Sequence, residues 1–211
     1  MTQSKPMSEK CYLLNDNHQK INMNNIIAAI KNVYPVSDRA VKELTQKFSK
    51  HQFAKRKVII REGLLDRKVY FIEQGITRSY CYVDGREVTT WFSKEGDITF
   101  GLLDLYLGKP GFEYVETLED TTAYSISIDD LNELYTKEID IANWSRVIHQ
   151  ECLLSLQCSR IDRLSLSAAD RYAKLVKQCP EVLLRVNLGY IASFLGITQP
   201  TLSKIRADFN L

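Results

Sequence analysis

The sequence predicts an α+β fold, in which an N-terminal antiparallel β jelly roll is followed by a long helix and a C-terminal helix-turn-helix with little or no wing. Three observations predict this order. About eight short segments rich in β-branched and aromatic residues lie in the first two thirds of the chain. A helical apolar pattern then runs from about Ile139 to Arg163, and residues 188–206 fit two short helices joined by a glycine turn.

Composition sets the class of protein. The 211 residues are 45% hydrophobic and 26% charged, which is ordinary for a soluble chain with one large or two modest domains. We find no apolar run of membrane-spanning length, and the polar start Met1 to Lys5 lacks the apolar core of a signal peptide, so we expect a cytoplasmic protein without a membrane partner. The five cysteines lack the short paired spacing of a metal site, and we expect them to be reduced thiols. They are Cys11, Cys81, Cys152, Cys158 and Cys179.

The N-terminal part begins with a polar, Asn-rich segment, which we expect as a mobile tail at residues 1–24. A helix is predicted from Asn25 to Asn32. Ser37-Asp38 then opens a second helix, because a serine hydroxyl can cap the first amides. Its inward stripe should consist of Val41, Leu44 and Phe48.

The strands of the roll are predicted from alternating or β-branched segments bounded by glycines. Asp84-Gly85 predicts a tight hairpin turn, because both residues tolerate a positive φ. Ser127-Ile128-Asp129 restores helix, so the roll and its flanking helices should occupy residues 25–138. The strand segments are 57–61, 69–72, 77–83, 88–92, 98–100 and a region of further strands from 114 to 128.

The long helix and the residues after it should occupy residues 139–165. Apolar residues recur every seven positions at Val147, Leu154 and Ile161, and further apolar residues widen the surface. One side could cover the roll and the other could pair with the same helix of a second molecule, so we predict a homodimer. The alternative is that the whole face packs within one chain. Leu164-Ser165-Leu166 is expected to be a hinge.

The C-terminal domain should occupy residues 166–211. Ser167 and Asp170 resemble a capping box that opens a helix to about Gln178. Gly196 lies between two predicted helices, where a left-handed backbone favours glycine, and Thr198 can cap the second helix. Inward positions of the two helices are Ile191, Leu195, Leu202 and Ile205.

The outward face of the last helix has side chains that suit DNA. Glutamine can pair with adenine, lysine can reach guanine or phosphate, and hydroxyls can hold phosphate oxygens. Residues 167–211 hold six Lys or Arg against three Asp or Glu, a modest basic excess that favours two copies acting together. A helical hairpin with a solvated polar face is the alternative. The candidate DNA-binding residues are Thr198, Gln199, Pro200, Thr201, Ser203, Lys204 and Arg206.

This order of elements resembles the Crp/Fnr family of bacterial transcription regulators, from about Val36 to Arg206. The most specific segments are Val69 to Gly75, Glu95-Gly96-Asp97 and Tyr190 to Thr198. The resemblance implies a homodimer that binds a roughly palindromic site in double-stranded DNA and helps or blocks RNA polymerase. It also implies a small-molecule effector in the roll that shifts the DNA-binding domains about the hinge.

The sequence departs from cyclic-nucleotide-binding members of the family. In those, Gly-Glu holds the ribose, and Arg with Ser or Thr holds the cyclic phosphate. Here Leu102 follows Gly101, and our alignment places Gly111 and Phe112 where the Arg and hydroxyl residues should be. A buried phosphate would lack its cation, so we expect no cyclic AMP and no other cofactor, although Lys109 or Arg78 is an alternative cation. The candidate pocket, for an unidentified effector or none, consists of Gly101, Leu102, Leu103, Tyr114, Leu156 and Gln157.

Other classes find less support. An iron-sulfur sensor needs a cluster of N-terminal cysteines, and only Cys11 lies there. No context singles out a haem ligand among His18, His51 and His149. We find no nucleophile elbow, P-loop or metal-ligand spacing, so an enzyme is not expected. The remaining rival is a ligand-binding or protein-interaction module whose helix-turn-helix does not bind DNA, since Glu181 and Asp208 dilute the basic surface.

Overall fold

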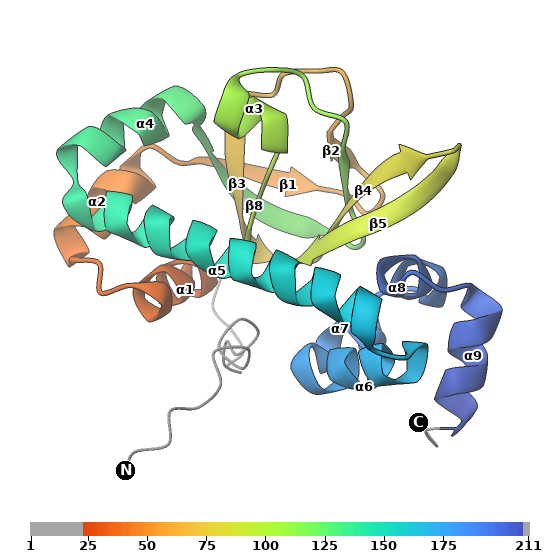
Figure 1. Cartoon of the computed structure of the whole chain (residues 1–211). Helices are drawn as coiled ribbons and strands as arrows, with labels where there is room; N and C mark the ends of the chain where they lie inside the picture. Colours follow the sequence, from red (N-terminus) through yellow and green to blue (C-terminus); the bar gives the residue numbers. More distant parts are fainter. Residues whose placement is uncertain (1–22, 209–211) are drawn as a thin grey trace, which may run out of the picture. The chain divides into compact units, whose positions relative to one another are not determined.

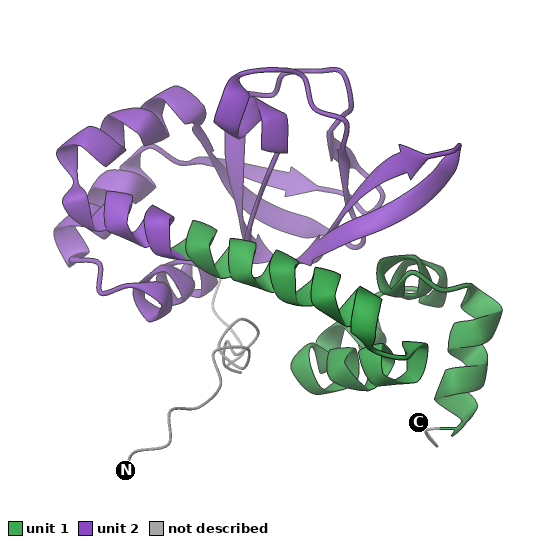
Figure 2. Cartoon of the chain, in the orientation of Figure 1, with its two compact units in different colours: residues 1–17, 148–211 green, residues 18–147 purple. Residues whose placement is uncertain are grey.

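The computed structural model describes residues 23–208, which form two compact units, residues 23–147 and 148–208 (Figure 2). The division falls within the long helix, and the predicted domains 25–138, 139–165 and 166–211 remain predictions. The expected tail at residues 1–24 lies outside the described residues except for its last two. No helix in the described part of the chain is long and apolar enough to cross a membrane.

The first unit contains two four-stranded antiparallel sheets (Figure 1). Strand order is β1-β8-β3-β6 in one sheet and β2-β7-β4-β5 in the other, which is the arrangement of a double-sheet roll. The predicted antiparallel roll is thus confirmed. The strands are β1 (Ser49–Phe53), β2 (Val58–Ile60), β3 (Lys68–Gln74), β4 (Thr77–Val83), β5 (Arg86–Ser93), β6 (Ile98–Phe100), β7 (Tyr114–Thr117) and β8 (Thr121–Ser127).

The turn residues in the sequence predicted one hairpin of the roll correctly. Asp84 and Gly85 have φ angles of 50° and 73°, as the predicted hairpin between β4 and β5 requires. The predicted strand region from 114 to 128 is divided by a turn into β7 and β8, and Ile128 already belongs to the next helix. Strand β1 was not predicted, because its sequence Ser-Lys-His-Gln-Phe is polar and only its pairing with β8 identifies it.

The interior of the roll is filled by apolar side chains from both sheets. Tyr70, Ile72 and Ala123 project from the first sheet, and Ile60 and Val115 project from the second. These residues are at most 5% exposed. Their burial is the main hydrophobic contribution that holds the sheets together.

Helices pack on the other side of the first sheet: α1 (Asn24–Val33), α2 (Asp38–Gln46), α4 (Ile128–Lys137) and the start of α5 (Ile139–Ser165). Phe71 of β3 contacts Phe48 and Trp144, with ring centroids 4.8 Å and 5.8 Å away. Phe48 was predicted on the stripe of the second helix; it instead follows the end of α2, and it still packs on the sheet. Ser37 caps α2 through its hydroxyl, as predicted.

A buried carboxylate holds α1 to the sheet. Glu73 of β3, 6% exposed, accepts hydrogen bonds from the amides of Asn25 (3.2 Å) and Ile26 (3.1 Å). These amides have no acceptor within the helix, and the positive end of a helix favours a negative charge. Burial raises the pKa of the Glu73 carboxyl, and hydrogen bonds from the backbone of Ile26, Asn25 and Asn24 partly oppose this rise.

The second unit contains the C-terminal part of α5 and a domain of short helices: α6 (Ala168–Gln178), α7 (Pro180–Arg185), α8 (Leu188–Leu195) and α9 (Gln199–Asp208). Ser167 caps α6, and the helix ends at Gln178, as predicted. Helix α7 was not predicted. The domain core is formed by Tyr172, Leu175, Val182, Val186, Ile191, Ala192, Leu195 and Leu202.

Candidate nucleic-acid interface and effector cassette

Helices α8 and α9 form the predicted helix-turn-helix. The turn is made by Gly196, whose φ of 69° lies in the left-handed region. The amides of Gly196 and Ile197 donate to Ser193 O (3.1 Å) and Ala192 O (3.0 Å), which closes the end of α8. The glycine turn therefore redirects the chain into α9 and also satisfies two of the last carbonyls of α8.

The start of α9 is capped as the sequence predicted. Thr198 Oγ1 accepts from the amide of Thr201 at 3.3 Å, and the two threonine hydroxyls lie 2.8 Å apart. Pro200 occupies the first turn, where its missing N–H removes no helical hydrogen bond. The predicted capping role of Thr198 is confirmed by these contacts.

The outward face of α9 is available to a partner. Leu202 is fully buried and Ile205 is half-buried, and these two residues direct the opposite face outward. Arg206 is half-buried. The other six predicted DNA-binding residues are exposed: Thr198, Gln199, Pro200, Thr201, Ser203 and Lys204.

Gln199 lies close to the preceding helix. A Cβ built at Gly189 would lie 3.2 Å from Gln199 Oε1, so the side-chain amide lies over the start of α8. A glycine at position 189 leaves room for this contact. Gln199 thus lies at the edge between the two helices, while the exposed Ser203 and Lys204 extend the face along α9.

The predicted dimer residues lie on α5. Leu154 and Ile161 are 46% and 59% exposed, and Val147 is half-buried. Such a number of exposed large apolar side chains on one helix is unusual for a surface that faces only water. Three further leucines of α5 share this exposure: Leu153, Leu156 and Leu164.

The cassette expected to hold an effector begins with helix α3 (Leu102–Leu107), which was not predicted. Gly101 precedes this helix, Leu102 is exposed, and Leu103 and Tyr114 are half-buried. These four residues lie in the first compact unit. Leu156 and Gln157 are exposed residues of α5 in the other unit, so their part in the pocket remains a prediction.

A carboxylate of the protein itself lies at the start of α3. Glu113 is 7% exposed, and its Oε1 accepts a hydrogen bond from the Leu102 amide. A Cβ at Gly111 would lie 3.1 Å from both carboxylate oxygens, so a glycine at this position leaves space for the side chain. Sequence reasoning missed Glu113 because it placed the neighbouring Gly111 and Phe112 at the phosphate position and looked there for a cation, not for a carboxylate.

The two cations that the sequence suggested as alternatives are Arg78 and Lys109. Arg78 is 1% exposed and pairs with Glu116 (3.0 Å) and Glu87, so it is committed within the second sheet. Lys109 is exposed.

Burial raises the pKa of the Cys81 thiol, and the carboxylates of Glu113 and Glu62 raise it further, which disfavours a reactive thiolate there.

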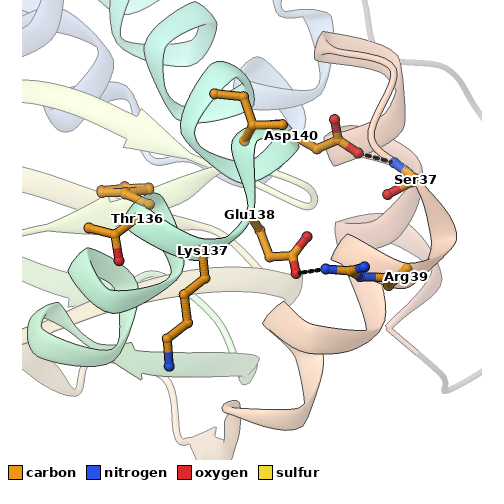
Figure 3. A pocket seen from close by; sticks show the side chains of 8 residues that line it. Ser37, Arg39, Thr136, Lys137, Glu138 and Asp140 are labelled. Carbon is orange, nitrogen blue, oxygen red and sulfur yellow. Dashed lines mark hydrogen bonds and ion pairs between the residues drawn. The ribbon is translucent and has the colours of Figure 1, made fainter.

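A separate shallow pocket of about 380 Å³ lies where α2 meets the junction of α4 and α5 (Figure 3). Its polar groups pair with one another: Arg39 contacts Glu138 at 2.6 Å, and the Ser37 amide donates to Asp140 Oδ2 at 3.0 Å. The hydrogen bond from Ser37 lowers the pKa of Asp140. These contacts join α2 to α5 and leave few groups for a ligand.

Comparison with known proteins gives a domain family and a fold. Residues 50–138 match the family model of the cyclic nucleotide-binding domain. Among curated proteins, no sequence matches the chain. FixK2 from Bradyrhizobium japonicum has a similar structure, with a TM-score of 0.67 and 20% identity, over 77% of this chain and 84% of FixK2.

Two further solved structures extend the likeness. A variant of CooA from Carboxydothermus hydrogenoformans has a TM-score of 0.63 and 20% identity, over 90% of this chain and 86% of CooA. A putative Crp/Fnr transcriptional regulator from Eubacterium rectale has a TM-score of 0.64 and 16% identity, over 85% of this chain and 88% of that protein. The chain has the fold of the Crp/Fnr regulators. The predicted fold class is thereby confirmed.

In this Crp/Fnr fold, Gly196 is the residue on which the geometry of the turn depends. We predict that Gly196→Ala lowers the free energy of unfolding by about 1 to 2 kcal/mol, because an L residue is strained at a positive φ. A Cβ there would meet no atom within 4 Å, so packing adds nothing to the cost. Thermal or denaturant unfolding measures the loss.

Gly196→Asn is the matched control, because asparagine tolerates the left-handed region better than alanine does. Its loss should be clearly smaller. Equal losses of unfolding free energy in the two variants would contradict the prediction, because they would show that backbone strain at the positive φ is not the cause of the loss.

Proposed function

We propose that this chain is a sequence-specific DNA-binding transcription regulator. It binds a roughly palindromic site as a homodimer, with one α9 helix in the major groove of each half-site. The observation that carries the proposal is the exposed polar face of α9, fixed by a buried Leu202 and a glycine turn. A recognition helix presents its first residues to base edges, and these are the positions of Gln199, Pro200 and Ser203.

The homodimer is supported by the exposed apolar residues of α5. Leu154 and Ile161 are seven residues apart, which is the repeat of a coiled coil, and burying them against a second copy would remove apolar surface from water. Val147, one repeat earlier, is the third predicted contact. Two copies also double the modest basic charge of the DNA-binding domain and allow two half-sites to be bound together.

The roll, in this proposal, does not bind cyclic AMP. The buried Glu113 carboxylate occupies the start of α3 and would repel a cyclic phosphate. An effector, if the roll takes one, is an unidentified small molecule. The further partner is RNA polymerase, and the protein acts in the cytoplasm without catalytic activity.

Base-reading residues can be tested by substitution. We predict that Lys204→Ala and, separately, Gln199→Ala each weaken specific DNA binding by about 1 to 3 kcal/mol, because each removes a contact to a base edge. The measurement is fluorescence anisotropy with DNA selected by the wild-type protein, beside random DNA as a reference.

Lys42→Ala is the control, because Lys42 is an exposed helical lysine of the other compact unit and the variant loses the same charge. Its DNA affinity should be nearly unchanged. Equal losses of affinity on selected and random DNA would show that Lys204 or Gln199 contacts phosphate and not a base edge. A wild-type protein with neither sequence preference nor a steep salt dependence would favour the interaction module instead.

The cassette can be tested with cyclic AMP itself. We predict that cyclic AMP, far above physiological concentration, leaves the melting temperature of the wild-type protein unchanged, because the Glu113 carboxylate would repel the cyclic phosphate. Binding would be detected as a rise in melting temperature, since a ligand that binds only the native state raises its stability. A saturable rise in melting temperature would contradict the proposal that the Glu113 carboxylate excludes a cyclic phosphate.

A further inference from the structure

The predicted hinge between α5 and α6 is a short linker in the structure. Leu164 and Ser165 belong to α5, so only Leu166 and Ser167 join the two helices. The Leu166 amide donates to Asp162 O at 2.9 Å, which continues the last turn of α5. Ser167 Oγ accepts from the Asp170 amide at 3.2 Å and so already belongs to the cap of α6. The role of residues 164–166 as a hinge stays a prediction.

An ion pair bridges this junction. Lys174 of α6 contacts Asp162 in the last turns of α5. The two side chains are 31% and 21% exposed, so water screens them less than it screens a fully exposed pair. The pair therefore links α6 to α5 across the two-residue linker.

Two arginines connect the same junction to the helix-turn-helix. The last four carbonyls of α8 have no amide donor within the helix, and the turn amides of Gly196 and Ile197 donate to those of Ser193 and Ala192. Arg163 of α5 donates to Phe194 O at 2.9 Å. Arg171 of α6 donates to Leu195 O at 3.2 Å. Cations at a helix C-terminus are also favoured by the helix dipole.

Arg171 makes a second contact that ties these features together. Its Nε donates to Leu195 O, and its Nη1 donates to Leu166 O, in the linker, at 2.7 Å. A single side chain therefore joins the linker to the end of α8, beside the turn into α9. All the residues concerned lie in one compact unit, residues 148–208.

We infer that Arg163, Arg171 and the Asp162–Lys174 ion pair form a clamp, which locks the junction and holds α9 at a fixed position relative to the C-terminal part of α5. These are positioning residues. The consequence for DNA rests on the proposed function: in a dimer formed through α5, the clamp sets the separation of the two α9 helices, which must match the spacing of the half-sites. A loose junction would lower the effective concentration of the second helix at its half-site.

Hydrogen exchange tests the clamp without DNA. Arg163→Ala should increase amide exchange by about tenfold in segments 164–171 and 194–199, because local opening becomes less costly. Arg160→Ala is the matched control, since Arg160 is an exposed arginine of the same helix that takes no part in the clamp. Exchange in Arg163→Ala no faster than in Arg160→Ala would overturn the inference.

The ion pair provides a second test, which still decides the inference if Arg163→Ala folds poorly. Asp162→Lys should speed exchange in segment 164–171, because two lysines would then face each other. Combining it with Lys174→Asp restores opposite charges and should return exchange to near the wild-type rate. A double variant that exchanges as fast as Asp162→Lys alone would show that the pair does not lock the junction.

DNA binding separates the clamp from the proposed function. Arg163→Ala should weaken binding to a two-half-site DNA by about tenfold and leave binding to a single half-site unchanged, because only the first needs a fixed separation. Equal losses on both would make Arg163 a direct DNA contact and overturn its positioning role. If the wild-type protein shows no sequence preference, the proposed function fails, and the exchange experiment still decides the clamp.

Discussion

The way in which α8 ends is the constraint on which the candidate interface depends. A helix leaves its last carbonyls unsatisfied, and here the turn amides of Gly196 and Ile197 satisfy two of them while Arg163 and Arg171 satisfy the next two. The left-handed Gly196 then sends the chain into α9 with Leu202 buried. The outward direction of the polar face follows from this packing, because the opposite face of α9 is committed to the core.

In the roll, a carboxylate of the protein itself lies at the start of α3. Glu113 accepts a hydrogen bond from the Leu102 amide, and Gly111 leaves space for its carboxylate. The interior below is filled by apolar side chains from both sheets. The roll therefore combines the fold of a cyclic nucleotide-binding domain with a buried carboxylate at the start of α3.

Sequence reasoning succeeded where a structure depends on a few neighbouring residues. The turn at Asp84-Gly85, the caps at Ser37 and Ser167, and the turn at Gly196 all follow from local backbone preferences. It failed where distant residues decide. The polar strand β1 exists because it pairs with β8, α3 is a short helix without a clear period, and the roles of Glu113 and Arg163 depend on partners 11 and 31 residues away. Side-chain partners of this kind leave no periodic signal in the sequence.

Selection of bound sequences from a random pool of double-stranded DNA tests the central claim most directly, because it requires both a base-reading face and a paired arrangement. With the full-length wild-type protein, we expect an enriched inverted repeat whose half-sites are about 10 base pairs apart, centre to centre, or a multiple of that spacing. A pool that shows no enriched sequence after repeated rounds, or a single unrepeated motif bound by one copy, would contradict the account.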